Sequence, residues 1–124
     1  MMITIDMTSK QPIYEQLKNK ITRLAVSNVF EADYKLPSVR SLAKELMVNP
    51  NTVQKAYADL EREGIIYSVR GKGSFISKGV EQNIFVREEA LTELKQSVNK
   101  CKVYKIDKAS VLKVINQIYE QEVV

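Results

Sequence analysis

The chain of 124 residues contains no histidine and only one cysteine, Cys101. Histidine is the commonest general base and metal ligand in proteins, so its absence weighs against an enzyme and against a metal site. A single cysteine excludes a disulfide within the chain. We therefore expect no catalytic residues, no metal ligands and no cofactor.

The sequence also lacks long apolar runs. No segment approaches the roughly 20 apolar residues of a membrane-spanning helix, and residues 1–6 lack the basic start and apolar core of a secretory signal. With 44% hydrophobic and 27% charged residues, the composition is that of an ordinary globular protein. We expect a cytoplasmic protein without a membrane partner, built as one compact domain with an appendage.

The lone cysteine falls in a stretch with helical spacing. Cys101 lies on the same stripe as Leu94 and Val98, so we interpret it as a small, buried, apolar side chain. The alternative is a redox-sensing thiol, which would need exposure and a neighbouring cation.

Two helix starts lie close together in the middle of the chain. Ser38 and Asn49 are suitable N-caps, and Pro50 fits the first helical position. Apolar residues at helical spacing follow each cap, namely Val39, Leu42, Ala43 and Leu46, then Val53, Ala56, Tyr57 and Leu60. The short connection forces a steep packing angle, which the small Ala43 permits. The pattern predicts a helix-turn-helix with helices at 39–46 and from 50 to about 62.

A basic turn follows the second of these helices. Gly64 is expected to end that helix in a left-handed conformation. Residues 65–69 and 74–77 favour strands by composition, and between them lies the segment Arg70-Gly71-Lys72-Gly73. We predict a β-hairpin with a basic tip, which forms a wing beside the helix pair.

The flanking segments predict further helices. A scaffold helix begins at Pro12 and carries one apolar face made of Ile13, Leu17, Ile21 and Leu24. After a linker or lead-in at 80–86, two amphipathic helices run from Glu88 to about 103 and onward from a cap at Asp107. Two such helices make a poor core alone. We expect their apolar faces to pair with a second subunit through Leu91, Leu94, Val98, Val111, Leu112, Ile115, Ile118 and Tyr119.

The predicted fold is therefore mostly α with a small β-hairpin. It comprises a winged helix-turn-helix domain at 10–78, followed at 79–124 by a linker and a two-helix dimerisation region. The basic residues are concentrated in the first part. Residues 12–78 hold 11 Lys and Arg against 7 Asp and Glu, so the whole net charge of +4 lies there. This modest excess supports a polyanionic partner only when it is taken together with the motif.

The helix from Pro50 is suited to the major groove of B-form DNA, because its N-terminal end brings free amides and a positive dipole toward phosphates. Asparagine and glutamine can pair with adenine, threonine can contact thymine, and lysine can reach guanine or phosphate. The candidate DNA contacts are Asn49, Pro50, Asn51, Thr52, Gln54 and Lys55. The alternative is that Asn49 is only a cap and the other polar residues are solvated.

Arg40 and the wing residues also allow two interpretations each. Arg40 can fork onto guanine or phosphate, or it can be a surface arginine paired with Glu45. Gly71 and Gly73 can serve only the turn, or they can let the backbone approach a sugar-phosphate chain closely. The neighbouring Arg70 and Lys72 favour the second interpretation.

Several motifs resemble one family. The stretch from Pro12 to Ser77 resembles the winged-helix DNA-binding domain of GntR-type bacterial transcription regulators. The resemblance rests on Pro-Ile-Tyr-Glu-Gln-Leu at 12–17, Leu-Pro-Ser-Val-Arg-Ser-Leu-Ala at 36–43, Val-Asn-Pro-Asn-Thr-Val at 48–53, Leu-Glu-Arg-Glu-Gly at 60–64 and Gly-Lys-Gly-Ser-Phe-Ile at 71–76. The Asn-Pro-Asn-Thr-Val form and the short helical tail are similar to the small YtrA subgroup, whose C-terminal region is a dimerising helix pair.

The resemblance implies roles for particular residues. It implies that Arg40 contacts a base, that the first turn from Asn49 to Gln54 contacts DNA, and that Arg70, Gly71 and Lys72 enter the minor groove. Pro50 and Gln54 stand where several relatives have arginine, so the operator sequence does not transfer. Met47 replaces a frequent glycine, at a cost of ~1 kcal/mol if its backbone is left-handed.

We therefore expect a homodimeric DNA-binding transcription regulator, a repressor that binds a palindromic double-stranded operator. No small-molecule effector is required by the sequence. One alternative is a winged-helix protein-interaction module whose basic face binds an acidic partner. Another is a small-molecule sensor with a pocket between tail and wing.

Overall fold

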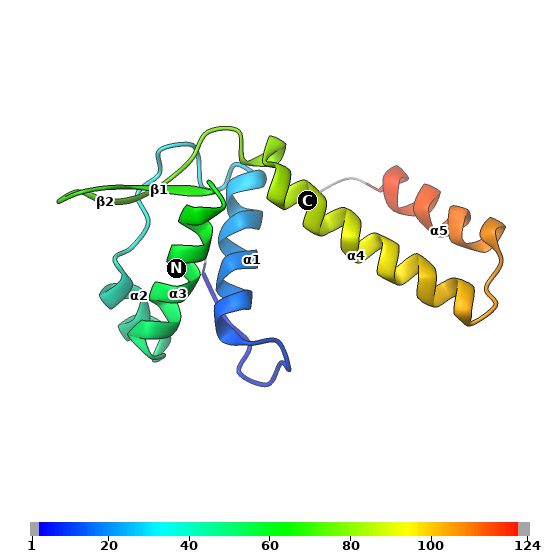
Figure 1. The fold of residues 1–124 in the computed structure, drawn as a ribbon, viewed down its shortest axis with the longest axis horizontal. Coiled ribbons are helices and arrows are strands. Elements are labelled where there is room, and N and C mark those ends of the chain that lie inside the picture. Colours follow the sequence, from blue (N-terminus) through cyan, green and yellow to red (C-terminus); the bar gives the residue numbers. More distant parts are fainter. Residues whose placement is uncertain (1–2, 122–124) are drawn as a thin grey trace. The chain divides into compact units, whose positions relative to one another are not determined.

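The computed structural model describes residues 3–121, which form five α-helices, one short 3-10 helix and one two-stranded antiparallel sheet (Figure 1). The chain divides into two compact units, Met1–Val86 and Arg87–Val124, which we call the N-terminal and C-terminal units. The predicted fold class, mostly α with a small hairpin, is confirmed. Within residues 3–121, none of the helices combines the length and the apolar character needed to cross a bilayer.

The N-terminal unit holds the predicted helix-turn-helix. Its helices are α1 (Ile13–Val26), α2 (Val39–Leu46) and α3 (Pro50–Arg62). Both predicted N-caps are formed. The Ser41 amide donates to Ser38 Oγ at 3.1 Å, and the Asn51 amide donates to Asn49 Oδ1 at 2.8 Å.

The core of this unit lies where α1 and α2 pack against α3. Its buried side chains are mainly the predicted helical stripes, among them Leu17, Ile21, Leu42, Ala43, Val53, Ala56, Tyr57 and Leu60. The Tyr57 hydroxyl donates to the Pro37 carbonyl at 2.6 Å, and burial raises the pKa of this phenol. The hydroxyl therefore stays a neutral donor that ties α3 to the residue before α2. Ile3 is also buried, a contribution that the sequence pattern did not reveal.

The predicted wing consists of β1 (Ile66–Val69) and β2 (Gly73–Ile76), paired antiparallel. The strand pairing ends at Val69 opposite Gly73, and the Lys72 amide donates to the Val69 carbonyl at 2.9 Å to close the turn. The preceding link also joins this sheet, because Lys35 forms a bridge with Phe75. The hairpin is thus held at its base and free at its tip.

The segment expected to be a linker at 80–86 instead packs on the N-terminal unit. Val80 starts a 3-10 helix, Val80–Gln82, and is buried, while α4 (Ile84–Val103) begins four residues before the predicted start at Glu88. The cause is Asn83. Its Oδ1 accepts from the Phe85 amide at 2.9 Å and the Val86 amide at 3.2 Å, and its Nδ2 donates to the Glu63 carbonyl at 2.8 Å.

Four helices are followed by a residue in the left-handed conformation, the usual helix C-terminus. These residues are Asn28, Met47, Gly64 and Lys105, with φ of 61°, 58°, 78° and 63°. The amide after each of the last three bonds back five residues, as in Ile65 N to Leu60 O at 2.9 Å. Gly64 behaves as predicted, and Met47 carries the strain expected of a side chain in this position.

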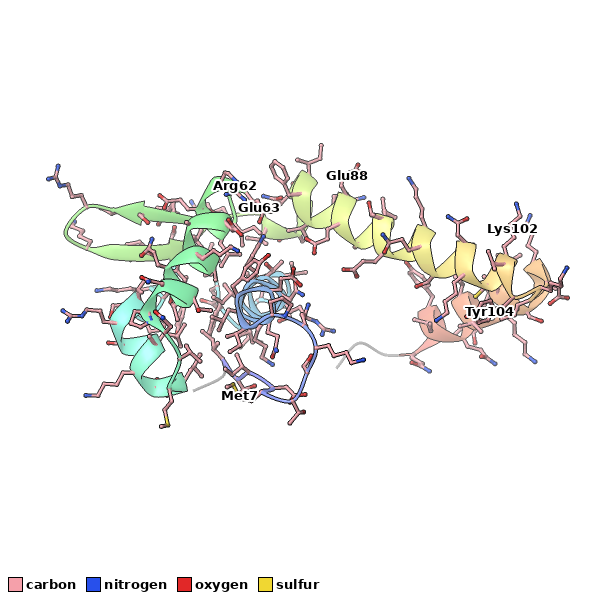
Figure 2. All side chains as sticks on the ribbon, turned by 60° about the horizontal axis from the view of Figure 1, so that its bottom comes forward. Met7, Arg62, Glu63, Glu88, Lys102 and Tyr104 are labelled. Atoms are coloured by element: carbon pink, nitrogen blue, oxygen red, sulfur yellow. The ribbon has the colours of Figure 1, made fainter. Side chains whose placement is uncertain are left out.

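The C-terminal unit contains most of α4 and all of α5 (Lys108–Glu120). Asp107 caps α5 as predicted, since its Oδ1 accepts from the Ser110 amide at 3.2 Å. Hydrogen bonding to the Ser110 side chain and then to its amide lowers the pKa of the Asp107 carboxyl. Side chains stand out along α4 from Glu88 near its start to Lys102 near its end (Figure 2). In its described part, 87–121, only Cys101, Val111 and Ile115 are even partly buried. Cys101 is therefore not fully buried within a single chain, contrary to our interpretation.

Candidate nucleic-acid interface

The turn between α2 and α3 fixes how α3 is presented. Met47 reverses the chain with φ 58° and ψ 44°, and its side chain is 89% exposed. Val48 packs against the core. These two residues hold the N-terminal end of α3 at the surface, while its Val53 stripe faces α1 and α2.

The first turns of α3 present several of the predicted DNA contacts to solvent. Asn51 and Gln54 are exposed and Thr52 is half-buried. The carbonyl oxygen of the Asn49 side chain is occupied by its cap, which satisfies one free amide of the helix. The exposed side chains of Asn51 and Gln54 form no hydrogen bond to another residue within residues 3–121 and are open to an external partner.

Arg40 lies exposed near the start of α2. Among the residues that the structure describes, it forms no ion pair with Glu45 or any other carboxylate. The surface-pair interpretation thus has no support in the structure. The guanidinium keeps its full charge and all its donors for an external partner.

Lys55 takes a position that the sequence did not predict. Its Nζ lies 3.8 Å from the centroid of the Tyr14 ring on α1, a cation–π contact. Lys55 is nonetheless exposed. It sits on the side of α3 that faces α1, one turn beyond Asn51.

The two wing glycines differ in their surroundings. Both have positive φ, 78° at Gly71 and 122° at Gly73, so both are required by the turn. A Cβ on Gly73 would lie 3.1 Å from Lys35 Cε, whereas a Cβ on Gly71 would meet nothing within 4 Å. The close approach of Lys35 therefore accounts for a glycine at position 73 without any external partner. Gly71, between the exposed Arg70 and Lys72, leaves open backbone at the tip.

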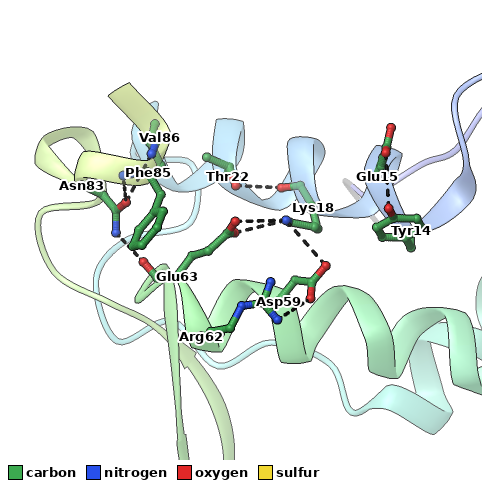
Figure 3. Close-up of polar contacts among 10 residues, drawn as sticks. All are labelled: Tyr14, Glu15, Lys18, Thr22, Asp59, Arg62, Glu63, Asn83, Phe85 and Val86. Atoms are coloured by element: carbon green, nitrogen blue, oxygen red, sulfur yellow. Dashed lines mark hydrogen bonds and ion pairs between the residues drawn. The ribbon is translucent and has the colours of Figure 1, made fainter. Parts of the chain in front are cut away.

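Two acidic residues at the C-terminal end of α3, Asp59 and Glu63, form ion pairs within the protein. Lys18 on α1 lies 3.7 Å from Asp59 and 3.2 Å from Glu63, and Arg62 lies 2.9 Å from Asp59 (Figure 3). These pairs occupy the carboxylates of Asp59 and Glu63, and those of Lys18 join α1 to the C-terminal end of α3. The cations that remain unpaired in residues 3–121 of this unit include Arg40, Lys55, Arg70, Lys72 and Lys35.

Sequence reasoning missed two residues of this surface. Lys35 lies over Gly73 because the chain before α2 bridges to β2, a long-range pairing without a periodic signal. Tyr14 was noticed only as part of a motif. The predicted dimerisation residues belong to the C-terminal unit, where Leu91, Leu94, Leu112, Ile118 and Tyr119 are 45–86% exposed.

A three-helix core that presents α3 at the surface, with a basic hairpin after it, defines a winged helix-turn-helix protein of the DNA-binding class. The gntR family of bacterial regulatory proteins matches residues 11–76, more than half of the chain. The chain belongs to this family, and it is a DNA-binding transcription regulator.

Known proteins support the assignment along most of the chain. The HTH-type transcriptional repressor YtrA of Bacillus subtilis is 43% identical over 97 residues, which cover 78% of this chain and 73% of YtrA. A crystal structure of a transcriptional antiterminator from Listeria monocytogenes EGD-e is 34% identical with a TM-score of 0.79, and the match covers 100% of this chain and 97% of that one. The resemblance to YtrA-type members is confirmed.

A second similar structure includes DNA. AraR(DBD) in complex with operator ORX1 is 31% identical with a TM-score of 0.52, and the match covers 59% of this chain and 90% of that one. The similarity is thus to a DNA-binding domain captured on its operator. These relatives are transcription regulators, which are not enzymes.

Proposed function

We propose that the protein is a homodimeric repressor that acts in the cytoplasm on a palindromic operator. One observation carries this proposal: Arg40, the outward side of α3 and the wing tip are all exposed on one unit, with no carboxylate paired to their cations within residues 3–121. Repression follows the assignment of YtrA, the relative that is 43% identical. No effector is required.

In this proposal α3 enters the major groove by its N-terminal end. Asn51 and Gln54 meet base edges, Thr52 lies beside them, and Arg40 reaches a guanine or a phosphate from the start of α2. The capped Asn49 and the adjacent Pro50 approach the backbone rather than reading bases. The wing tip, Arg70 to Gly73, lies along the minor groove, where the open Gly71 backbone permits close contact.

The proposed dimer forms through the C-terminal unit. Its apolar side chains lie mostly in solvent in a single chain, with Leu94 48% and Ile118 58% exposed. Burying such side chains is favourable by about 25 cal/mol per Å² of apolar surface. Two-fold symmetry would then place two α3 helices on half-sites about one turn of DNA apart or at a multiple of it.

The test compares operator DNA, selected by footprinting on genomic fragments, with random DNA of equal length. Arg40→Ala should weaken operator binding by about 1–3 kcal/mol per subunit and random DNA binding much less. Arg23→Ala removes the same charge from an exposed site on α1 and is the matched control. Equal, small losses on both DNAs with Arg40→Ala would contradict base reading. Binding no tighter than to random DNA would instead favour the protein-interaction alternative.

A further inference from the structure

The contact between α1 and α3 holds two lysines in different ways. Lys18, on α1, lies between Asp59 of α3 and Glu63, the residue that follows α3, at 3.7 and 3.2 Å (Figure 3). Lys55, on α3, lies over the ring of Tyr14, which stands one turn before Lys18 on α1. The same two helices thus pair one lysine with carboxylates and the other with an aromatic face.

The two partners have different electrostatic consequences. The carboxylates of Asp59 and Glu63 offset the positive charge of Lys18, so this lysine adds little to the attraction of a polyanion. An aromatic ring attracts the ammonium group through its quadrupole but carries no net charge, so the Lys55 ammonium keeps its full positive charge. Within residues 3–121, Lys55 belongs to none of the ion pairs.

The ring also limits where the ammonium can be. A free lysine samples many rotamers, and ordering it against a phosphate costs conformational entropy. The Tyr14 ring holds Nζ at 3.8 Å from its centroid before any DNA is present. Tyr14 is itself half-buried and packed against the core, so it is a fixed support.

We propose that Tyr14 is a positioning residue that holds Lys55 for a DNA phosphate at the edge of the groove. This inference rests on the proposed function, in which α3 enters the groove. Phosphate is the favoured partner because the Lys55 ammonium is a compact point charge, the form in which lysine binds phosphate, and the Tyr14 ring holds it toward α1. The contact should therefore be independent of sequence.

The experiment measures operator affinity against salt concentration for Tyr14→Leu, Tyr14→Phe, Lys55→Ala and the double variant Tyr14→Leu/Lys55→Ala. Lys55→Ala should lower the slope of log K against log salt by about one per subunit. Tyr14→Leu should weaken binding about twofold to fivefold, the range of an exposed cation–π contact. Tyr14→Phe keeps the ring, loses only the hydroxyl and should bind like the unchanged protein.

The double variant identifies the route of the effect. If Tyr14 acts through Lys55, Tyr14→Leu should add nothing in the Lys55→Ala background. An equal loss in both backgrounds would overturn the proposal, and so would a loss in Tyr14→Phe as large as in Tyr14→Leu. An unchanged salt slope in Lys55→Ala would also overturn it, while tight operator binding in that variant would leave the proposed function intact.

A second measurement does not depend on the folding of any variant. Protons above an aromatic face are shifted upfield, so the ε-methylene protons of Lys55 should show this shift in the NMR spectrum of the unchanged, DNA-free protein. Tyr14→Phe should preserve the shift. Ordinary lysine values in the unchanged protein would show that the ring does not hold the side chain and would overturn the proposal.

Discussion

The two units of this protein bury their apolar residues to very different extents. In the N-terminal unit α1, α2, α3 and the wing share one core, in which Leu17, Val53 and Leu60 are fully buried. In the C-terminal unit α4 and α5 bury no side chain fully in the described residues. A unit with three helices and a sheet can surround a core, whereas two helices leave one face of each uncovered.

This difference in burial implies that the two units are stabilised in different ways, one within a single chain and the other with the help of a partner. The N-terminal unit has the contacts that it needs within one chain. The C-terminal unit keeps side chains such as Leu94 and Ile118 about half exposed, so its stability should depend on a partner and therefore on protein concentration. The proposed DNA contacts and the proposed dimer contacts thus fall in different units, so substitutions can perturb them separately.

The largest effect is expected from a cavity in the N-terminal core. Leu60→Ala should lower the free energy of unfolding by about 2–5 kcal/mol, because Leu60 is fully buried and the site cannot close around the space. Leu112→Ala makes the same chemical change where the side chain is 45% exposed, and in a monomer it should cost less than about 1 kcal/mol. Urea denaturation at low protein concentration compares the two, and equal losses would contradict the distinction between the units.

A charge on the uncovered face should separate the subunits. Leu94→Asp would place a carboxylate in the proposed interface, so sedimentation should show a monomer. Operator affinity should then fall by about a hundredfold or more as the second half-site contact is lost. Gln96→Asp adds the same charge on the opposite side of α4 and should remain dimeric. If the Leu94→Asp variant were monomeric and kept full operator affinity, DNA binding would not depend on dimerisation, contrary to the proposal.

The sequence predicts the local features of this fold better than its long-range contacts. The caps at Ser38 and Asn49, the α2 and α3 stripes and the left-handed Gly64 were all predicted, because each depends on a few adjacent residues. The burial of Ile3 and the bridge from Lys35 to Phe75 were not predicted, since they depend on chain segments far apart in sequence.

The same limit applies to the site. Arg40, Asn51 and Gln54 could be proposed from helix position and side-chain chemistry alone. The cation–π contact of Lys55 with Tyr14 could not, because those residues are 41 positions apart and meet only through the packing of α1 on α3. The start of α4 was misplaced for a similar reason, since Asn83 bonds to the distant carbonyl of Glu63.

Removing the Asn83 side chain should loosen the end of the N-terminal unit. Asn83→Ala leaves the Glu63 carbonyl and the first amides of α4 without their partner, and it should cost about 1–3 kcal/mol. Asn83→Asp keeps an acceptor for those amides but loses the donor to Glu63 and should be intermediate. Hydrogen exchange at Phe85 and Val86 should quicken in Asn83→Ala. Unchanged exchange there would mean that the start of α4 is held by packing alone.

The smallest expected effects come from glycine substitutions at left-handed positions. One such substitution can be made in each unit, so the two units can be compared directly. Met47 and Lys105 both carry a side chain at positive φ, 58° and 63°. Glycine relieves a left-handed strain of roughly 1–2 kcal/mol, but it also raises the conformational entropy of the unfolded chain, which offsets part of this stabilisation. The free energy of unfolding of each variant should therefore rise by up to about 1 kcal/mol. Lys44→Gly, inside α2, should instead lose about 1 kcal/mol.

Calorimetry then shows where each gain falls. Met47→Gly should raise the unfolding temperature of the N-terminal unit at any protein concentration. Lys105→Gly should raise only the transition that depends on concentration, because in the proposed dimer it acts on a unit whose core the partner completes. If both variants shifted a single transition equally, the two units would unfold together. The units could then still have the separate roles proposed for them, but their stabilities would not be independent.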